Sequence, residues 1–280
     1  MPTLSACTAE RLAAFGRLAL VVGHPGHELK VFGVLSECKP WVYILTDGSG
    51  RHGTSRLPST EKLIQIVGAQ RGELFGLISD IAIYEAILAP RPILFLQMVD
   101  RLAASLIEHE IDTVAGDATE GFNPTHDICR ALIDAAVEIA TRLTGKPIGN
   151  YEVRLTGWER KSELEHDDQC LHLRLDDELL SRKFAAAEQY PELKDEVQRS
   201  VEHFGREYFR TECLRRVSEI APPAASGKPF YESWGEQQVA KGAYKSGIRF
   251  QQHVVPILDK IREHAASAVP DLPEYSPTER

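Results

Sequence analysis

Two histidines near the start of the chain are spaced so that they could share one metal ion. His24 and His27 belong to the segment His24-Pro-Gly-His-Glu28, which follows an apolar run and precedes a helical pattern. A third histidine, His126, follows the loop after a later apolar run. In open α/β sheets ligands bind beyond the carboxyl ends of the strands, so we expect the three imidazoles to converge there. Neutral imidazole suits Zn²⁺, and three protein ligands with one open position form the catalytic arrangement.

Spacing alone leaves a second interpretation open, because a histidine in a loop is commonly a surface or capping residue. Five scattered cysteines without a Cys-x-x-Cys pair argue against a disulfide framework and against a thiolate zinc finger. Seven further histidines have no spacing typical of metal ligands, and we interpret them as surface or packing residues: His52, His109, His166, His172, His203, His253 and His264.

The elements that must position the three histidines alternate between strand and helix. Residues 18–23 form a continuous apolar run that predicts a strand buried on both faces, and residues 29–38 predict the helix after it. Residues 41–45 predict a second strand, 111–115 a later one, and 127–143 the helix that follows it. This alternation indicates a parallel sheet covered by helices, which is an α/β fold.

The second half of the chain has a different pattern. Helices are also predicted over 59–68 and 93–110, whereas 81–84 is too short to assign to either type. Beyond residue 149 we predict strands over 151–155 and 170–175 and charged helices over 177–187 and 196–217. A C-terminal helical segment is predicted over 231–266. A proline-rich stretch over 221–229 separates the last of them. We therefore expect an α/β domain over residues 1–220 and a helical extension over 221–280 that packs on it.

Charge and hydropathy limit the classes of partner. With 41 acidic and 32 basic residues and a formal net charge of -9, the surface should repel phosphate backbones, so nucleic acid is not an expected partner. The apolar run at 18–22 is far shorter than the roughly 20 residues that a membrane span needs, and the N-terminus lacks a secretory signal pattern. We expect a cytoplasmic protein without a membrane partner, and association with further copies of the chain stays open.

Three motifs in this order resemble the LmbE-like, or PIG-L-like, family of zinc-dependent deacetylases. They are the strand leading into His24-Pro-Gly-His-Glu28, Thr46-Asp-Gly48 after the second strand, and Glu120-Gly-Phe-Asn-Pro-Thr-His126-Asp127 before a helix. The resemblance covers most of residues 15–215. It implies a Rossmann-like three-layer fold with a mostly parallel sheet, followed here by the C-terminal helical extension. It also implies that His24, His27 and His126 bind the zinc ion, with His27 standing where the family has aspartate.

Two positions depart from the family's pattern and change its proton-transfer groups. Gly26 stands where the family has the aspartate that acts as general base, and glycine cannot accept a proton. Asn123 stands where the family has a histidine, and its amide can donate a hydrogen bond to an oxyanion but cannot act as an acid. We predict Asp127 as the replacement base, although capping of the following helix is its structural alternative. Other carboxylates that could approach the metal are Asp117, Glu120 and Glu28.

Substrate contacts follow from the same resemblance. Arg56 corresponds to an arginine near the start of the helix after the second strand, and a guanidinium suits a phosphate or a sugar hydroxyl. Asp47 and Asp80 fall near the family's pocket, although a structural role such as ordering a loop is at least as good an interpretation of either. We expect the C-terminal aromatic side chains to pack on the core in preference to stacking on a sugar: Phe230, Tyr231 and Trp234.

The sequence therefore predicts a metal-dependent hydrolase. Its reaction would be deacetylation, the cleavage of a C–N amide bond in a small N-acylated molecule such as an amino sugar or a sugar conjugate. Its cofactor would be Zn²⁺ or another divalent transition metal, and its partner a small-molecule substrate. Because Gly26 replaces the general base, two alternatives stay open: a non-catalytic metal- or sugar-binding protein of the same fold, and a metal enzyme of altered chemistry.

Overall fold

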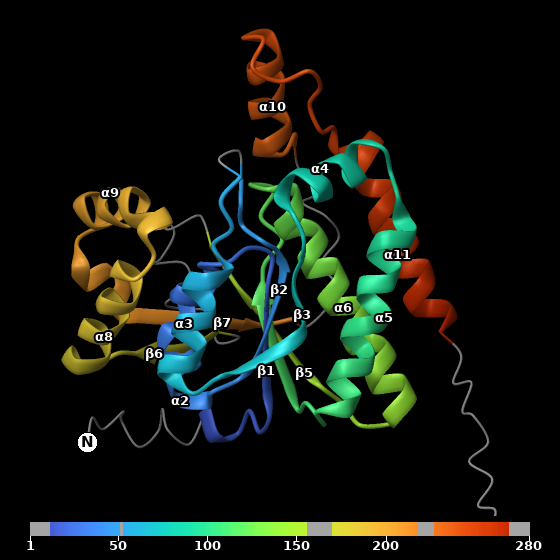
Figure 1. The fold of residues 1–280 in the computed structure, drawn as a ribbon. Helices are drawn as coiled ribbons and strands as arrows, with labels where there is room; N and C mark the ends of the chain where they lie inside the picture. Colours follow the sequence, from blue (N-terminus) through green and yellow to red (C-terminus); the bar gives the residue numbers. More distant parts are fainter. Residues whose placement is uncertain (1–11, 51–52, 156–169, 218–226, 269–280) are drawn as a thin grey trace, which may run out of the picture.

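A seven-stranded sheet forms the centre of the structure, with helices on both of its faces (Figure 1). The structure is a computed structural model that describes residues 12–50, 53–155, 170–217 and 227–268. Its strands lie in the order β3-β2-β1-β4-β5-β7-β6. Their bounds are β1 Leu18–Val22, β2 Trp41–Thr46, β3 Gln70–Ile78, β4 Thr113–Asp117, β5 Gly149–Val153, β6 Cys170–Arg174 and β7 Thr211–Arg216.

Five adjacent strands are parallel, and the two strands at one edge complete the sheet in antiparallel pairing. β1 pairs in parallel with β2 and β4, β2 with β3, and β4 with β5. β7 pairs antiparallel with both β5 and β6. The predicted α/β class with a mostly parallel sheet is thereby confirmed. The chain builds β1 to β3 in one direction and then returns to place β4 beside β1, so the strand order reverses between β1 and β4.

The sheet separates two apolar cores, and helices cover each core on its outer side. Val21 contributes to the core under α5, α6 and α11, whereas its neighbours Leu20 and Val22 contribute to the core under α2, α3 and α8. A strand covered on both faces is apolar at every position, which explains the run at 18–22.

The helices are η1 His27–Val31, α2 Phe32–Cys38, α3 Leu57–Val67, α4 Asp80–Leu88, α5 Pro92–Glu108, α6 Pro124–Thr144, α8 Asp177–Glu188, η3 Pro191–Leu193, α9 Lys194–Phe204, η4 Arg206–Arg210, α10 Phe230–Ala240, η5 Phe250–Val254 and α11 Val255–Ser267.

α6 begins beside the carboxyl end of β4. The Asn123 side chain caps it by accepting a hydrogen bond from the backbone N–H of Thr125 at 2.8 Å, and Pro124 occupies its first turn. The helix ends at Gly145, whose φ of 69° is the left-handed conformation typical of a C-terminal cap. It therefore starts three residues earlier than the pattern at 127–143 predicts, because the cap and the proline precede the first apolar residue.

One predicted helix is wrong over part of its length, and one open assignment is settled. The helix predicted over 196–217 ends at Phe204, because Gly205 with a φ of 76° stops it, and the chain continues into the strand β7. The alternating burial of β7 shows the period of two that distinguishes a strand from a helix. Residues 81–84, which the sequence left unassigned, belong to the helix α4.

The C-terminal helix α11 completes one of the two cores. Ile257 and Ile261 of α11 are buried against α5 and α6, and Arg142 of α6 donates a hydrogen bond to the carbonyl of Ala265 at 2.6 Å. The predicted domain division at residue 220 falls outside the described residues and stays a prediction. Within the described part of the chain, no helix is both long and apolar enough to cross a membrane.

Candidate metal centre

The rings of the three predicted metal ligands lie close together where the strand order reverses. His24 and His27 follow β1, and His126 lies in the first turn of α6 after β4. Because β1 and β4 are paired, their carboxyl ends lie side by side. The ring centroids are 5.3 Å apart for His24 and His27, 5.2 Å for His24 and His126, and 4.7 Å for His27 and His126. Ligand sites at such reversals are a general property of open α/β sheets.

His24 is held through one of its two ring nitrogens. Its Nδ1 atom lies 2.7 Å from Thr46 Oγ1, at the end of β2, and 3.1 Å from Asp80 Oδ1, at the start of α4. Its Nε2 atom lies 3.5 Å from Nδ2 of Asn123. A carboxylate at Nδ1 orients the ring and leaves Nε2 for a ligand, as is typical of histidines that bind metals. Asp80, predicted to contact substrate, thus lies behind His24.

His27 is held in the same way by Asp117, the last residue of β4. Its Nδ1 atom lies 2.9 Å from Asp117 Oδ2, and the backbone N–H of Gly23 donates to the same oxygen at 2.8 Å. Asp117 is completely buried. Ligand atoms of His27, Asp117 and His126 also lie within 4.8 Å of one another. The ligand atoms that lie close enough to share an ion are thus those of His27, Asp117 and His126. His24 adjoins this set through its ring, whose centroid lies 5.3 Å from that of His27 and 5.2 Å from that of His126.

The carboxylates behind the imidazoles are ionised despite their burial. Burial alone would raise the pKa of Asp80, but the hydrogen bond and the charge of His24 hold it well below its usual range. Burial likewise opposes ionisation of Asp117, and the charge and hydrogen bond of His27 lower its pKa. For His126, burial and the charge of nearby His27 lower the pKa well below its usual range, so that the ring is neutral. A neutral imidazole at His126 together with two ionised carboxylates suits a divalent cation.

Two buried polar atoms of this cluster have no hydrogen-bond partner among the described residues. They are His126 Nδ1 and Asp117 Oδ1. Buried polar atoms in folded proteins are nearly always bonded to protein, water or an ion, so both call for a partner. Imidazole nitrogen and carboxylate oxygen are also ligand types that Zn²⁺ takes. The residues present therefore fit a metal ion.

Gly26 has a backbone conformation and surroundings that exclude a side chain. Its φ is 105°, and a Cβ atom built there would lie 2.4 Å from Cδ1 of Leu193 in η3. The space beside position 26 is thus occupied by a leucine from a distant segment. The next carboxylate, Glu28, is completely buried and accepts hydrogen bonds from the Gly26 N–H at 2.8 Å, from Thr60 Oγ1 at 2.8 Å and from the Tyr190 hydroxyl. Glu28 therefore orders the corner.

Asn123 faces the imidazoles, whereas the contacts of Asp127 lie elsewhere. Besides capping α6, Asn123 places its Nδ2 atom against His24. Asp127 Oδ1 accepts hydrogen bonds from the backbone N–H groups of Glu120 and Gly121, both at 3.0 Å. Burial raises the pKa of Asp127 to about 6. That value suits a general base, but none of its hydrogen bonds reaches the three histidines, so its predicted catalytic role stays a prediction.

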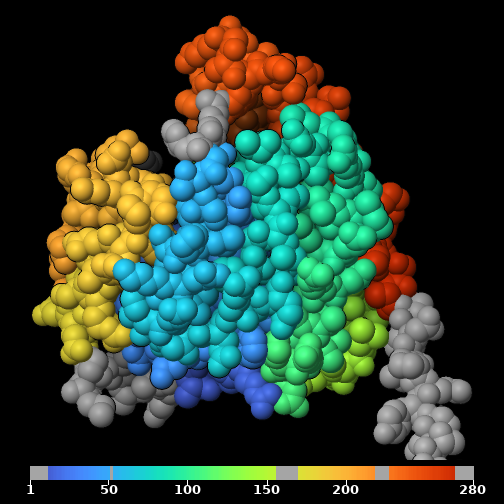
Figure 2. Space-filling model, in the orientation of Figure 1, coloured from blue at the N-terminus to red at the C-terminus, as the bar shows by residue number. Residues whose placement is uncertain are grey.

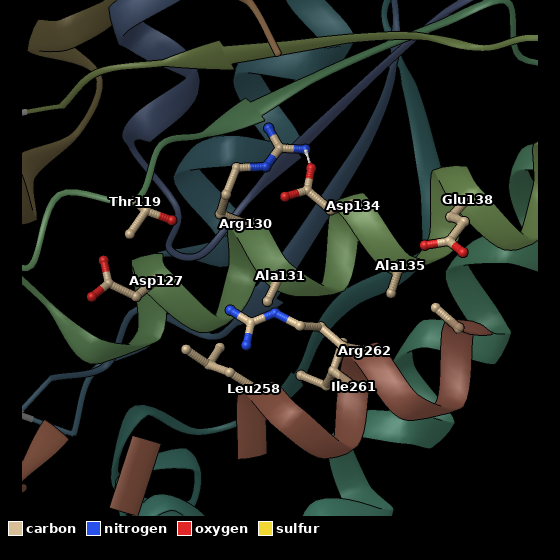
Figure 3. Close-up of a pocket in the computed structure, with 11 residues that line it drawn as sticks. Thr119, Asp127, Arg130, Ala131, Asp134, Ala135, Glu138, Leu258, Ile261 and Arg262 are labelled. Atoms are coloured by element: carbon tan, nitrogen blue, oxygen red, sulfur yellow. Dashed lines mark ion pairs between the residues drawn. The ribbon is translucent and has the colours of Figure 1, made fainter. Parts of the chain in front are cut away.

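A small pocket lies between α6 and α11 (Figure 3). Asp127 and Arg130 reach it from α6, and Leu258 and Arg262 from α11. Its volume of about 40 Å³ is enough for a few water molecules. It is too small for a sugar, and none of the three histidines lines it.

The loop after β2 brings a cation to the same corner. Asp47 Oδ1 accepts hydrogen bonds from the backbone N–H groups of Ser49 at 3.0 Å and Asp80 at 3.2 Å. These bonds order the loop, which is the structural role considered for Asp47. A Cβ atom at Gly48 would lie 3.2 Å from Arg56 Cδ and 2.7 Å from Pro25 Cδ, so the Arg56 stem runs beside the corner. Among the described residues, the Arg56 guanidinium has no ion-pair or hydrogen-bond partner, so it is available to a ligand.

Three exposed aromatic rings stack on one another, beginning with Phe122, which precedes Asn123 in the chain. We call Phe122, Phe230 and Trp234 the aromatic surface. Phe122 and Phe230 stack with centroids 5.0 Å apart, and Phe230 and Trp234 with centroids 6.1 Å apart. They are 44%, 52% and 45% exposed, so the prediction that Phe230 and Trp234 pack on the core is wrong, while Tyr231 between them is buried. One side of α10 thus faces Phe122, and Figure 2 shows this helix projecting beyond the rest of the face.

Sequence reasoning assigned no role to several residues that shape this site. Thr46 and Phe122 lie inside motifs that were recognised, so their position next to predicted ligands was an available signal. Tyr190 and Leu193 reach the corner from the connection between α8 and α9. Nothing in the local sequence around either residue indicates that contact, because only the tertiary fold creates it.

No known family model and no curated protein matches the sequence. Solved structures to which the chain is similar include the conserved protein TT1542 from Thermus thermophilus, at 18% identity over 75% of this chain and 99% of that one, with a TM-score of 0.47. Another is the A40926 pseudoaglycone deacetylase Dbv21, at 15% identity over 74% of this chain and 99% of that one, with a TM-score of 0.46.

A third similar structure is the zinc-inhibited form of the teicoplanin deacetylase Orf2. It has 13% identity over 72% of this chain and 99% of that one, with a TM-score of 0.45. All three structures share less than 20% sequence identity with this chain. With TM-scores below 0.5 they do not assign a function, which has to be argued from the residues of the site.

Proposed function

We propose that the protein is a metal-dependent hydrolase that deacetylates a small N-acylated molecule, an amino sugar or a sugar conjugate. The observation that carries the proposal is the convergence of His24, His27 and His126 at the reversal of strand order, with ring centroids 4.7 to 5.3 Å apart. Ionised carboxylates stand behind two of the three rings. A shared ligand would also account for the buried Nδ1 atom of His126, which has no hydrogen-bond partner among the described residues.

In place of His27, Asp117 and His126, we propose the three imidazoles as the ligand set. Asp80 and Asp117 each occupy an Nδ1 atom, which directs Nε2 of His24 and of His27 away from the carboxylates. Asp117 Oδ2 already accepts two hydrogen bonds, so it acts as a positioning residue for His27. Zn²⁺ bound there would polarise a carbonyl and lower the pKa of a bound water to about 7.

The remaining groups of the site bind and orient the substrate. Nδ2 of Asn123 is a donor at the edge of the cluster, where it can bond the oxygen that gains charge during amide cleavage. The guanidinium of Arg56 can bind a phosphate or sugar hydroxyl. The aromatic surface offers exposed ring faces, which suit the apolar face of a sugar or an acyl chain. These three features favour a substrate that combines an amide, polar substituents and an apolar portion.

The proton acceptor is the part of the site that differs most from the family's pattern. Asp127 retains a carboxylate with a raised pKa, and we keep it as the proposed base. Its test is separate from that of the metal ligands: Asp127→Asn should abolish turnover without loss of bound zinc. Unchanged turnover in this variant would assign proton transfer to another group, such as a substituent of the substrate.

Release of acetate from a panel of N-acetylated amino sugars tests the proposed function. The zinc-loaded protein should release acetate from at least one compound, and His126→Ala should abolish that release. His264→Ala is the matched control, because His264 lies on α11 and pairs with Asp100 at 2.6 Å, away from the cluster. Absence of acetate release across sugars, sugar phosphates and sugar conjugates would contradict a deacetylase.

A non-catalytic metal- or sugar-binding protein is the second candidate, and one observation favours it. Leu193 fills the space that a side chain at position 26 would need, so the corner is built around the absence of the family's base. In this case zinc and an N-acetylated sugar would bind with measurable affinity, and the sugar would be recovered intact. Calorimetric titration of the sugar, followed by analysis of its acetyl group, separates the two candidates.

A further inference from the structure

We propose a second metal site, for a thiophilic divalent ion such as Zn²⁺, formed by Cys170, His172 and Cys213 on the antiparallel pair β6–β7. The ligand atoms of these three side chains lie within 4.8 Å of one another. The site is independent of the imidazole cluster and of the proposed reaction, because it shares no residue with either. The odd number and wide spacing of the cysteines do not indicate this site in the sequence, because Cys213 meets the other two residues only through the pairing of β6 with β7.

The register of the two strands explains the arrangement. His172 is directly paired with Cys213, and Cys170 precedes His172 by two positions on β6. Residues two apart on a strand point to the same face of the sheet, and directly paired residues do so as well. All three side chains therefore project from one face, and the separation of neighbouring strands, about 4.8 Å, allows their ligand atoms to converge.

That face is opposite to the one that packs on the core. Leu173 and Leu214 alternate with the three ligands and are completely buried in the core under α2, α3 and α8. The other face carries the ligands together with Arg215, which pairs with Glu152 of β5. Cys170 is buried, and His172 and Cys213 are half-buried. An ion at the three ligands would therefore lie outside the core, on the opposite face of the two strands.

His172 supplies a second, independent observation. Its Nε2 atom is buried and has no hydrogen-bond partner among the described residues. An imidazole that only filled space would leave that nitrogen unsatisfied, at a cost comparable to that of a lost hydrogen bond. A bound ion satisfies it directly.

The donor set selects the class of ion. Thiolate sulfur and imidazole nitrogen favour Zn²⁺ and other thiophilic ions over Mg²⁺ or Ca²⁺, which prefer oxygen. Bonds of about 2.3 Å to sulfur and 2.0 Å to nitrogen place tetrahedral ligand atoms roughly 3.3 to 3.8 Å apart, so the three side chains must close by about 1 Å. Each thiol releases its proton as it binds, so one Zn²⁺ displaces two protons and forms a neutral Cys₂His centre, whose fourth position is filled by water.

A metal at this position would fasten the edge of the sheet. Among the described residues, β6 is the last strand of the sheet and pairs only with β7. Its bonds to an ion shared with β7 would add a cross-link to the backbone ladder. Zn²⁺ should accordingly raise the melting temperature of the wild-type protein, and part of this rise should persist in His126→Ala, which retains the second site.

Cobalt substitution tests the proposal directly, because sulfur ligation of Co²⁺ produces an intense near-ultraviolet charge-transfer band that nitrogen and oxygen ligands do not produce. The metal-free wild-type protein titrated with Co²⁺ should develop this band, and it should be lost in Cys170→Ser and in Cys213→Ser. It should persist in Cys38→Ser, the matched control cysteine of α2, and in His126→Ala. Circular dichroism should show that each variant is folded. Zinc analysis should give about two ions per wild-type chain and one in Cys213→Ser.

Three outcomes would overturn the proposal. The first is the absence of the sulfur band in the wild-type protein under reducing conditions. The second is its persistence in the double variant Cys170→Ser/Cys213→Ser. The third is a disulfide between these cysteines that persists in the purified protein and whose reduction restores no metal binding. Each leaves the imidazole cluster untouched, because loss of zinc in His126→Ala is measured separately.

Discussion

At the scale of single residues, position 26 links the fold to the chemistry. Gly26 combines a φ of 105° with close contact to Leu193, so the corner accommodates no side chain there. The same corner places His24 and His27, and buried Glu28 holds it by bonding the Gly26 N–H. A change at this position therefore affects both stability and the orientation of the imidazoles.

Gly26→Ala should destabilise the protein by about 1–3 kcal/mol, the usual cost of a non-glycine residue in a sparsely populated conformation. Gly145→Ala is the control, because Gly145 has a φ of 69° and open space around its Cβ position. Urea unfolding should show a larger loss for Gly26→Ala, and Leu193→Ala in the same chain should reduce the difference. Equal losses for the two glycines would show that the Leu193 contact is unimportant.

An acidic side chain at position 26 would also need room from Leu193. Gly26→Asp alone should leave acetate release unchanged or lower, because the new side chain meets Leu193. Gly26→Asp combined with Leu193→Ala should raise it, if the proton acceptor limits the rate, by up to the 10²–10⁴-fold that general base catalysis typically contributes. Kinetics of the single and double variants on the same substrate measure this, and a gain in Gly26→Asp alone would contradict the steric account.

At the scale of elements, helix ends and strand ends carry most of the polar side chains that are completely buried. Glu212 of β7 accepts hydrogen bonds from the backbone N–H groups of Gly33 at 2.9 Å and Val34 at 3.2 Å, at the start of α2. It also pairs with Lys183 of α8 at 2.8 Å. One carboxylate thus joins a strand and two helices, next to the corner that carries His24 and His27.

Glu212→Gln should destabilise the protein by about 3–5 kcal/mol, because buried Lys183 would keep its hydrogen bond to the Lys30 carbonyl but lose the opposite charge beside it. Glu61→Gln is the control on the exposed pair between Arg71 and Glu61, which lies 2.6 Å apart, and it should cost less than about 1 kcal/mol. Urea unfolding at pH 7 measures both. A loss for Glu212→Gln no larger than that for Glu61→Gln would contradict the proposed role of the buried pair.

The first turn of α6 predicts a dependence of stability on pH. Burial raises the pKa of Asp127 from 3.8 to about 6 in the folded protein. The stability that the neutral carboxyl contributes is therefore fully present below pH 3.8, and it is lost as pH rises through 6. The shift corresponds to an amount on the order of 2–3 kcal/mol. Asp127→Asn should remove this decrease in the free energy of unfolding with pH. Urea unfolding between pH 4 and 8 with chelator present measures it, and an unchanged decrease in the variant would assign the effect to other groups.

The elements also show how far the sequence could predict the structure. Strands covered on both faces, such as β1 and β4, are apolar throughout and were recognised, and so were the helices that follow them. β7 was mistaken for part of a helix, because its charged residues hide the alternation and Gly205 was not read as a stop. The three histidines could be predicted because each follows a recognised strand. Leu193, Tyr190 and the Cys170–Cys213 contact depend on tertiary structure, so no local pattern indicates them.

At the scale of the whole molecule, the C-terminal helix is part of the main core. Ile257 and Ile261 of α11 are buried together with residues of α5 and α6. The same part of the chain supplies α10, whose Tyr231 N–H donates to the carbonyl of Gly121 beside the metal-binding loop. Loss of α11 would therefore weaken the core and also affect the loop that carries Asn123 and His126.

Ile261→Ala should cost about 2–5 kcal/mol, as is usual for truncation of a buried isoleucine. Ile93→Ala, at a position that is 63% exposed, is the control and should cost much less. If α11 belongs to the main core, thermal unfolding of Ile261→Ala should remain a single transition at a lower temperature. A separate early transition with the main one unchanged would show that residues beyond 220 fold independently.

The measurement that tests the central claim most directly is the zinc content of variants of the imidazole cluster. We predict that His24→Ala, His27→Ala and His126→Ala each lose one zinc ion per chain, whereas His264→Ala retains it. Asp117→Asn should still bind the ion, about 10–100-fold more weakly, as expected for a residue that orients a ligand. Retention of full zinc affinity in His24→Ala, together with its loss in Asp117→Asn, would contradict the three-imidazole site and assign the ion to His27, Asp117 and His126.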